Sequence, residues 1–98
     1  MHKPVKWSSK ADSDFAGILD YLHFNWNKKI STKFIQKVRF CINLIEKNPK
    51  QFALINTDLQ IRKCVITKQN SLFYRETSTR IEILRIYDTR QDPEKLTF

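Results

Sequence analysis

The spacing of hydrophobic side chains changes once along this chain, and that change limits its fold more than any other feature. Between residues 10 and 47 the apolar side chains recur about every 3.6 residues, which is typical of amphipathic α-helices. From Leu59 onward they recur about every second residue, which is typical of β-strands. The sequence therefore predicts helices followed by strands, an α+β fold.

The first expected helix covers roughly residues 10–26. Ser8 or Ser9 can cap its start, and Asp12 and Asp14 in its first turn suit the helix dipole. A glycine inside a helix costs about 1 kcal/mol relative to alanine, so Gly17 predicts close packing at that point. The apolar stripe that would face the core consists of Phe15, Ile18, Leu19, Leu22 and Trp26.

The second expected helix covers about residues 30–47 and ends at Asn48-Pro49, because the residue before a proline disfavours the α conformation. The short connection at Asn25-Trp26-Asn27 predicts that the two helices form an antiparallel hairpin. The apolar stripe of this helix consists of Ile30, Phe34, Val38, Cys41, Ile42 and Ile45. A row of lysines four residues apart, Lys29, Lys33 and Lys37, is expected on another, solvated face.

Strands are expected on both sides of the helices. A short one lies near residues 3–8, and three more lie at residues 59–67, 71–77 and 80–87. Strands joined by short loops must be antiparallel, and the hairpin must cover one sheet face because both have an apolar side to bury. The predicted architecture is β-α-α-β-β-β, a single domain over residues 1–98 with a helical hairpin packed on one face of an antiparallel sheet. The other face is left for water or a partner.

Composition excludes several classes of function. The 98 residues include one glycine, so a Gly-rich loop that cradles phosphates is excluded. No apolar run reaches the roughly 18–20 residues that cross a bilayer, and no signal-peptide stretch opens the chain, so we expect a cytoplasmic protein without membrane contact. Cys41 and Cys64 are not spaced with His2 or His23 as zinc ligands would be, which predicts unpaired thiols, no metal and no cofactor.

Positive charge is the first indication of function. The chain has 18 Lys and Arg against 10 Asp and Glu, a formal net charge of +8, which favours a polyanion or an acidic protein as partner. The expected strands carry the candidate binding residues Arg62, Lys63, Arg75, Arg85 and Arg90. Side chains two residues apart share a sheet face, so Ile81, Ile83, Arg85 and Tyr87 are expected in one row. Such a cluster could bind phosphates and stack a base, or it could form ion pairs with Glu76, Glu82, Asp88 and Asp92.

A series of motifs along nearly the whole chain resembles the RelE/ParE toxins of bacterial type II toxin–antitoxin modules. The first half carries Val5-Lys6-Trp7-Ser8, Lys10-Ala11, Asp14-Phe15, Ile18, Tyr21 and Trp26, then Ile45, Asn48-Pro49 and Phe52. The second half carries Ile61-Arg62-Lys63, Leu72-Phe73-Tyr74-Arg75, Ile83-Leu84, Ile86, Asp88 and Arg90-Gln91-Asp92-Pro93. The resemblance implies a helical hairpin against an antiparallel sheet, in agreement with the element order above, and an antitoxin as partner.

The resemblance implies one of two mechanisms. RelE-like members cut mRNA on the ribosome without metal, by attack of a 2′-hydroxyl on the adjacent phosphate, which requires an acid, a base and cations. On that hypothesis Tyr87 is the acid–base residue, and Arg85 and Arg90 stabilise charge. ParE-like members instead poison DNA gyrase.

The details of the resemblance favour the ParE branch. The paired helices are long, and Tyr21 and Trp26 close the first, as in ParE-like members. Ser71 stands about where a RelE-type arginine would, and no histidine lies in the C-terminal half. Three hypotheses follow: a gyrase inhibitor neutralised by a cognate antitoxin, a ribosome-dependent mRNA endoribonuclease, and a basic binding module without toxicity.

Overall fold

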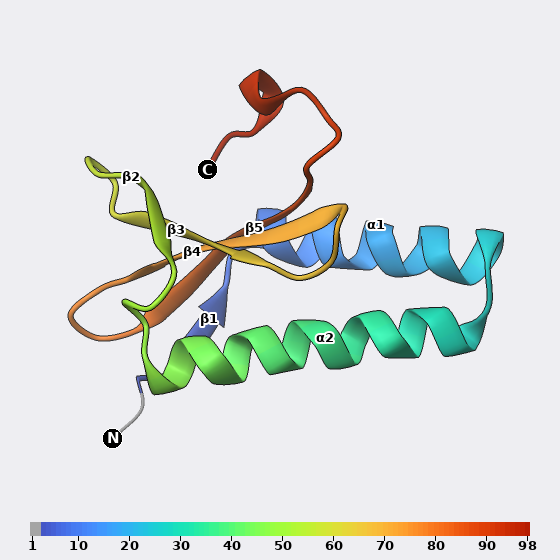
Figure 1. The fold of residues 1–98 in the computed structure, drawn as a ribbon, viewed down its shortest axis with the longest axis horizontal. Helices are drawn as coiled ribbons and strands as arrows, with labels where there is room; N and C mark the ends of the chain where they lie inside the picture. Colours follow the sequence, from blue (N-terminus) through green and yellow to red (C-terminus); the bar gives the residue numbers. More distant parts are fainter. Residues whose placement is uncertain (1–2) are drawn as a thin grey trace.

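Helices and sheet form two layers in the computed structural model, which describes residues 3–98 (Figure 1). Strand β1 is Val5–Trp7, helix α1 is Ser9–Asn25 and helix α2 is Lys28–Lys47. Strands β2 (Ala53–Asn56), β3 (Ile61–Val65), β4 (Asn70–Glu76) and β5 (Ile81–Asp88) follow, and then a 3₁₀ turn η1 (Pro93–Lys95). The α+β class and the helical hairpin on one sheet face are confirmed.

The sheet of the described residues is mixed rather than antiparallel throughout. Its strand order is β1-β5-β4-β3-β2, and β1 pairs with β5 in parallel, with Val5 opposite Ile81 and Trp7 opposite Ile83. The other neighbours are antiparallel because short connections join them. In the chain, both helices and strands β2, β3 and β4 separate β1 from its neighbour β5, so no short loop fixes the direction of β1. The four residues of β2 are too few for the sequence pattern to indicate a strand.

The ends of the helices follow from local capping. The Ser8 side chain accepts a hydrogen bond from the Ala11 N–H at 3.0 Å, and the Asn27 side chain accepts one from the Ile30 N–H at 3.0 Å. Trp26 and Asn27 alone connect α1 to α2, which makes the hairpin antiparallel as predicted. None of the helices in residues 3–98 is long and apolar enough to cross a bilayer.

The main core lies between the hairpin and the sheet. Its buried residues are Ala11, Phe34, Val38, Cys41, Ile45, Cys64, Ile66, Leu72, Tyr74, Ile81, Ile83 and Ile86, and part of the α1 stripe packs against them. Cys41 and Cys64 are free thiols whose sulfurs lie 3.7 and 4.0 Å from the same carbonyl oxygen, that of Val65. The hydrogen bond with Cys41 and burial raise the pKa of the Cys64 thiol well above its ordinary value.

A second, smaller core lies on the opposite face of the sheet. Ile61, Phe73 and Tyr87 are buried there, and Leu84 and Leu96 pack against them. The Phe98 ring lies 5.7 Å from the Phe73 ring, centroid to centroid. The expectation that this face is left for water or a partner is therefore wrong in part, because the C-terminal segment folds back over it (Figure 1).

A β-bulge in β5 corrects the predicted rows of side chains. Phe73 of β4 pairs with Arg85, but the next residue, Tyr74, pairs with Ile83, so Leu84 is an extra residue in β5. The extra residue shifts the alternation of faces. Ile81 and Ile83 consequently belong to the main core, whereas Tyr87, which was expected in their row, belongs to the second core.

The tip of the helical hairpin projects beyond the sheet (Figure 1). Three large side chains near the tip are mostly exposed: Tyr21 at 58%, Phe24 at 82% and Trp26 at 65%. Trp26 was expected in the buried stripe of the first helix. It fits the helical period, but the sheet does not extend far enough to cover it.

Candidate functional site

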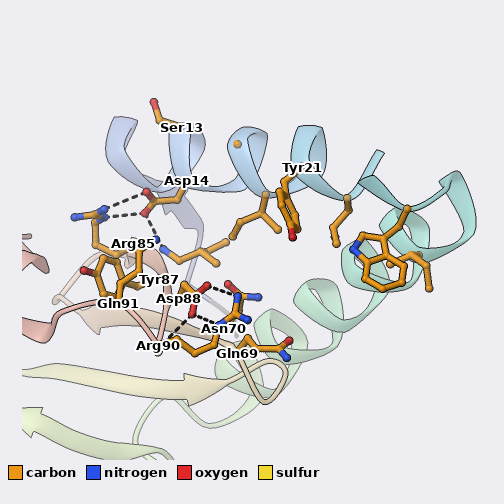
Figure 2. A pocket seen from close by; sticks show the side chains of 16 residues that line it. Ser13, Asp14, Tyr21, Gln69, Asn70, Arg85, Tyr87, Asp88, Arg90 and Gln91 are labelled. Carbon is orange, nitrogen blue, oxygen red and sulfur yellow. Dashed lines mark hydrogen bonds and ion pairs between the residues drawn. The ribbon is translucent and has the colours of Figure 1, made fainter. Parts of the chain in front are cut away.

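A groove of about 800 Å³ lies between α1 and the ends of β4 and β5 (Figure 2). We call it the α1 groove. Its lining includes Ser13, Asp14, Gly17 and Tyr21 from α1, Trp26 and Ile30 from the end of the hairpin, and Asn70, Arg85, Tyr87, Asp88 and Arg90 from the side of the sheet. Three predicted site residues, Arg85, Tyr87 and Arg90, thus meet in one place.

An ion pair between Asp14 and Arg85 closes one end of the α1 groove. The Arg85 guanidinium donates from Nε to Asp14 Oδ2 at 2.7 Å and from Nη2 to Oδ1 at 3.1 Å. Its Nη1 donates to the carbonyl oxygen of Thr97 at 2.7 Å. The two side chains are 14% and 18% exposed, and the hydrogen bonds to Asp14 raise the pKa of the Arg85 guanidinium.

The pair forms where the edge of the sheet is uncovered. β1 ends at Trp7, so beyond Ile83 the edge of β5 that faces away from β4 has no partner strand. Residues at the start of α1 form hydrogen bonds to this edge in place of a strand. The N-cap residue Ser8 donates from its N–H to the Ile83 carbonyl at 2.9 Å and from its hydroxyl to the Leu84 carbonyl at 2.8 Å. Asp14 Oδ2 then accepts the Ile86 N–H at 3.0 Å. The Asp14 carboxylate therefore accepts a hydrogen bond from a backbone N–H at the uncovered edge of β5, and it also neutralises the Arg85 guanidinium.

A second ion pair lies on the sheet side of the groove. Arg90 donates from Nε and Nη2 to the two carboxylate oxygens of Asp88, at 3.0 and 2.7 Å. These hydrogen bonds lower the pKa of Asp88 and raise that of Arg90. The Arg90 side chain is 68% exposed, so this pair stabilises the fold little and leaves the guanidinium open to a partner.

The Tyr87 hydroxyl is already used within the fold. It donates to the carbonyl oxygen of Asp92 at 2.8 Å, and the residue is only 8% exposed. The Arg85 guanidinium carbon lies 5.6 Å from the centre of the Tyr87 ring, within cation–π range. Tyr87 consequently fastens the C-terminal segment to the sheet.

The other predicted binding residues lie outside the groove. Arg62 points to the helical side, where it donates to the carbonyl oxygens of Lys50 and Phe52 at 3.2 and 2.8 Å. These bonds hold the loop after α2. Lys63 lies opposite Phe73 in the β3–β4 register, on the other face of the sheet, and its side chain makes no ion pair or hydrogen bond with a residue of 3–98.

Arg75 belongs to a separate cluster of charges. It donates to Glu82 Oε1 at 2.7 Å, while Arg80 donates to Glu82 Oε2 at 2.9 and 2.6 Å. Hydrogen bonds from Arg75 and Arg80 lower the pKa of Glu82. Both arginines are thereby paired with one carboxylate. Of the two alternatives that the sequence left open for Arg75, phosphate binding or an ion pair with an acidic residue, the structure shows the ion pair.

Most of the charged and hydroxyl groups of the α1 groove are engaged with other groups of the fold. Its two arginines are each neutralised by an aspartate, and its tyrosine hydroxyl is engaged. Within residues 3–98 no three His, Cys, Asp or Glu side chains gather as metal ligands would, and His23 is exposed near the hairpin tip; His2 lies outside the described residues. The accessible side chains of the lining include Arg90 and two large aromatic residues, Tyr21 and Trp26.

Sequence analysis missed three features of this site. Asp14 was assigned to the helix dipole, and its position in the family motif was the signal for a larger role. Asp88 appeared among the possible ion-pair partners, without a particular arginine. Close packing was predicted at Gly17, and that prediction is wrong, because a Cβ built there would meet no atom of the described residues within 4 Å. Nothing in the sequence indicated that Gly17 faces a groove.

Comparison with known proteins agrees with this fold. A family model described as the ParE toxin of the type II toxin–antitoxin system parDE matches residues 5–93. A search of curated protein sequences gives no match.

Solved toxin structures are similar in fold. A chain of the chromosomal ParDE toxin–antitoxin system from P. aeruginosa superimposes with a TM-score of 0.74 at 20% identity, covering 89% of this chain and 96% of that one. A YoeB/ParE toxin from Agrobacterium tumefaciens gives 0.63 at 13% identity, covering 87% and 96%. A chain of the E. coli DinJ-YafQ toxin–antitoxin complex gives 0.62 at 11% identity, covering 92% and 96%. Because the family model spans nearly the whole chain, and the fold agrees, this chain belongs to the ParE toxin family of type II toxin–antitoxin systems.

Proposed function

We propose that this chain is a cytoplasmic toxin that arrests growth by inhibiting DNA gyrase, and that a cognate antitoxin neutralises it. The family supports toxin and antitoxin as a pair, since the similar structures include toxin–antitoxin systems. One observation carries the choice of target. The groups that mRNA cleavage would require are engaged within the fold: Tyr87 with Asp92, and Arg85 with Asp14 and Thr97.

Those contacts favour binding over proton transfer. A general acid or base must reach the reacting phosphate, and the Tyr87 hydroxyl is buried and donates to a backbone carbonyl. Inhibition of gyrase by binding to its surface would require no accessible general acid or base. The net charge of +8 favours an acidic protein surface or DNA-bound target.

Ribosome-dependent cleavage of mRNA is the second candidate function. The observation in its favour is that Arg85, Tyr87 and Arg90 line one groove, and a YoeB/ParE toxin is similar in fold. A third candidate, a basic binding module without toxicity, predicts no growth arrest when the chain is induced.

The deciding experiment compares two tyrosine variants. Tyr87→Phe and Tyr74→Phe each remove one buried hydroxyl that donates to a backbone carbonyl, but Tyr74 contacts Pro49 and lies outside the groove. We expect the parent and both variants to inhibit gyrase supercoiling and arrest growth alike at matched levels of folded protein. Specific cleavage of ribosome-bound mRNA that is lost in Tyr87→Phe and kept in Tyr74→Phe would establish the nuclease instead, because an acid–base residue contributes about 10²–10⁴-fold to rate.

A further inference from the structure

Two cysteine thiols from different layers of the fold meet in the main core. Cys41 belongs to helix α2 and Cys64 to strand β3. Their sulfurs lie 3.7 and 4.0 Å from one atom, the carbonyl oxygen of Val65, and the two thiols are hydrogen-bonded to each other. Neither the gyrase hypothesis nor the nuclease alternative uses this pair.

The local pattern of each element turns its thiol toward the other. Cys41 is one of the buried residues of α2, with Val38 and Ile45 one turn away on either side. Along β3, Cys64 is buried while the next side chain, that of Val65, is 62% exposed on the other face of the sheet. Helix and strand thus present the two sulfurs to each other, as a disulfide between them requires.

The two thiols differ in their readiness to lose a proton. The hydrogen bond that Cys64 donates lowers the pKa of Cys41, and the same bond together with burial raises the pKa of Cys64. Because the thiolate is the form that reacts with oxidants, Cys41 is the nucleophile of the pair. A reactive thiol beside a second thiol that can resolve its oxidised form is typical of redox-sensitive sites.

The edge of β3 beside this pair is uncovered. Strand β2 pairs with β3 only as far as Lys63, so at Cys64 and Val65 the edge that faces away from β4 has no partner strand. Cys41 is 5% exposed and Cys64 is 2% exposed. A small oxidant therefore needs only a local opening at this edge to reach Cys41.

We propose that Cys41 and Cys64 form a redox site, which hydrogen peroxide converts into a disulfide that fastens α2 to β3. The Cys41 sulfur attacks one peroxide oxygen, the O–O bond breaks, one water leaves and Cys41 becomes a sulfenic acid. The Cys64 sulfur then attacks the Cys41 sulfur, the S–O bond breaks, and the hydroxyl leaves with the Cys64 proton as a second water. The two sulfurs together lose the two electrons that the peroxide gains.

The product suits its surroundings. A disulfide brings no charge into the main core, whereas a buried thiolate is desolvated there. A cross-link between α2 and β3 also restricts the unfolded chain and thereby stabilises the folded one. Disulfides of cytosolic proteins are usually transient, so we expect the free thiols of the structure at rest and the bridge under oxidative stress. This inference depends on neither gyrase nor an antitoxin.

The parent chain tests the proposal directly. The reduced, folded protein is treated with hydrogen peroxide, remaining thiols are blocked, and the intact mass and a peptide map are recorded. We expect a loss of two hydrogens, peptides joined through Cys41 and Cys64, and recovery of both thiols with dithiothreitol. The rate should not depend on protein concentration, because both thiols belong to one molecule. The bridged protein should melt at least about 5 °C above the reduced protein.

Two serine variants separate the roles of the thiols, since serine is similar in size to cysteine and keeps a hydrogen-bond donor. Cys64→Ser should accumulate a sulfenic acid at Cys41, captured by dimedone, and should gain no thermal stability from peroxide. Cys41→Ser should react at least about tenfold more slowly than Cys64→Ser, because burial keeps the remaining Cys64 thiol protonated. The measurements on the parent require neither variant, so they decide the proposal even if a serine unfolds the core.

Three outcomes would overturn the proposal. Thiols that stay reduced while glutathione in the same solution is oxidised would show that the fold protects them. Bridging only in urea, or only between molecules, would show that the two sulfurs cannot join in the folded chain. A bridged protein that melts below the reduced one would show that the cross-link strains the contact between α2 and β3.

Discussion

Asp14 and Arg85 lie 71 positions apart in the sequence and are joined by two hydrogen bonds, of 2.7 and 3.1 Å. The same carboxylate accepts the N–H of Ile86, so it ties α1 both to a side chain and to the backbone of β5. Arg85 in turn holds the Thr97 carbonyl near the end of the chain. Helix, sheet and C-terminal segment therefore meet at this one pair.

Removal of the Asp14 carboxylate should destabilise the fold. We expect Asp14→Asn to lower the free energy of unfolding by about 2–4 kcal/mol, because it leaves a largely buried guanidinium without its counter-charge. Asp20→Asn, on the exposed face of the same helix, should change it by less than about 0.5 kcal/mol. Urea unfolding at neutral pH measures both.

A double-mutant cycle isolates the pair itself. Asp14→Ala combined with Arg85→Ala should cost less than the sum of the two single variants, since the second removal no longer strands a charge. Strict additivity would show that the two side chains act independently, contrary to the structure.

The cluster around Glu82 should make the protein sensitive to acid. Hydrogen bonds from Arg75 and Arg80 lower the pKa of Glu82 in the folded state. Its stabilisation is therefore present above the pKa of the unfolded chain, about 4.3, and is lost as the pH falls through the lower folded value. We expect Glu82→Gln to be less stable than the parent at pH 7, and the difference to shrink toward pH 3.

Glu94→Gln is the matched control for that experiment. Glu94 is exposed in η1, and its side chain has no ion pair in residues 3–98. Its acid unfolding should follow that of the parent. If Glu82→Gln lost stability with acid as steeply as the parent does, Glu82 would contribute nothing to the acid response.

Tyr74 should make the free energy of unfolding fall at high pH, whereas Glu82 makes it fall at low pH. Burial raises its pKa to about 12, and its hydroxyl donates to the Pro49 carbonyl at 2.6 Å. The unfolded chain loses this proton near pH 10, while the folded protein keeps it, so stability should fall between pH 10 and 12 by up to about 1.4 kcal/mol per pH unit.

Tyr74→Phe should remove this part of the alkaline slope and cost about 1–2 kcal/mol at neutral pH, because the Pro49 carbonyl loses its donor. Tyr21→Phe, whose hydroxyl lies at the exposed hairpin tip, should leave the slope unchanged. Guanidinium unfolding between pH 8 and 12 compares the three proteins. An alkaline slope unaltered in Tyr74→Phe would contradict the assignment.

Antitoxin binding should weaken as salt rises. The attraction between a chain of charge +8 and an acidic partner is screened over about 10 Å at 0.1 M salt and about 3 Å at 1 M. The affinity of this chain for its antitoxin, the purified protein encoded by the reading frame adjacent to that of this chain, is measured across this range of salt concentrations. The free energy of unfolding of the toxin, measured at the same salt concentrations, shows whether the loss comes from binding. An affinity that stays flat would exclude an electrostatic contribution.

Much of the architecture could be predicted from local pattern. The period of apolar residues defined α1 and α2, and Ser8 and the Asn48-Pro49 pair marked their outer ends, because capping and the restriction before proline act over a few residues. The change of period at Leu59 placed β3, β4 and β5 to within a few residues. The family resemblance, carried by motifs in order along the chain, was confirmed by the family model.

What the tertiary structure alone decided depends on contacts between distant segments. The parallel pairing of β1 and the bulge at Leu84 arise from how strands align, and no local periodicity encodes that alignment. The bulge separates Tyr87 from Ile83, and the shortness of β1 leaves the edge that Asp14 covers. The sequence thus determined which side chains were available for a site, such as Arg85, Tyr87 and Arg90. The packing of helix against sheet decided which groups these side chains contact, and it left the open space beside Gly17.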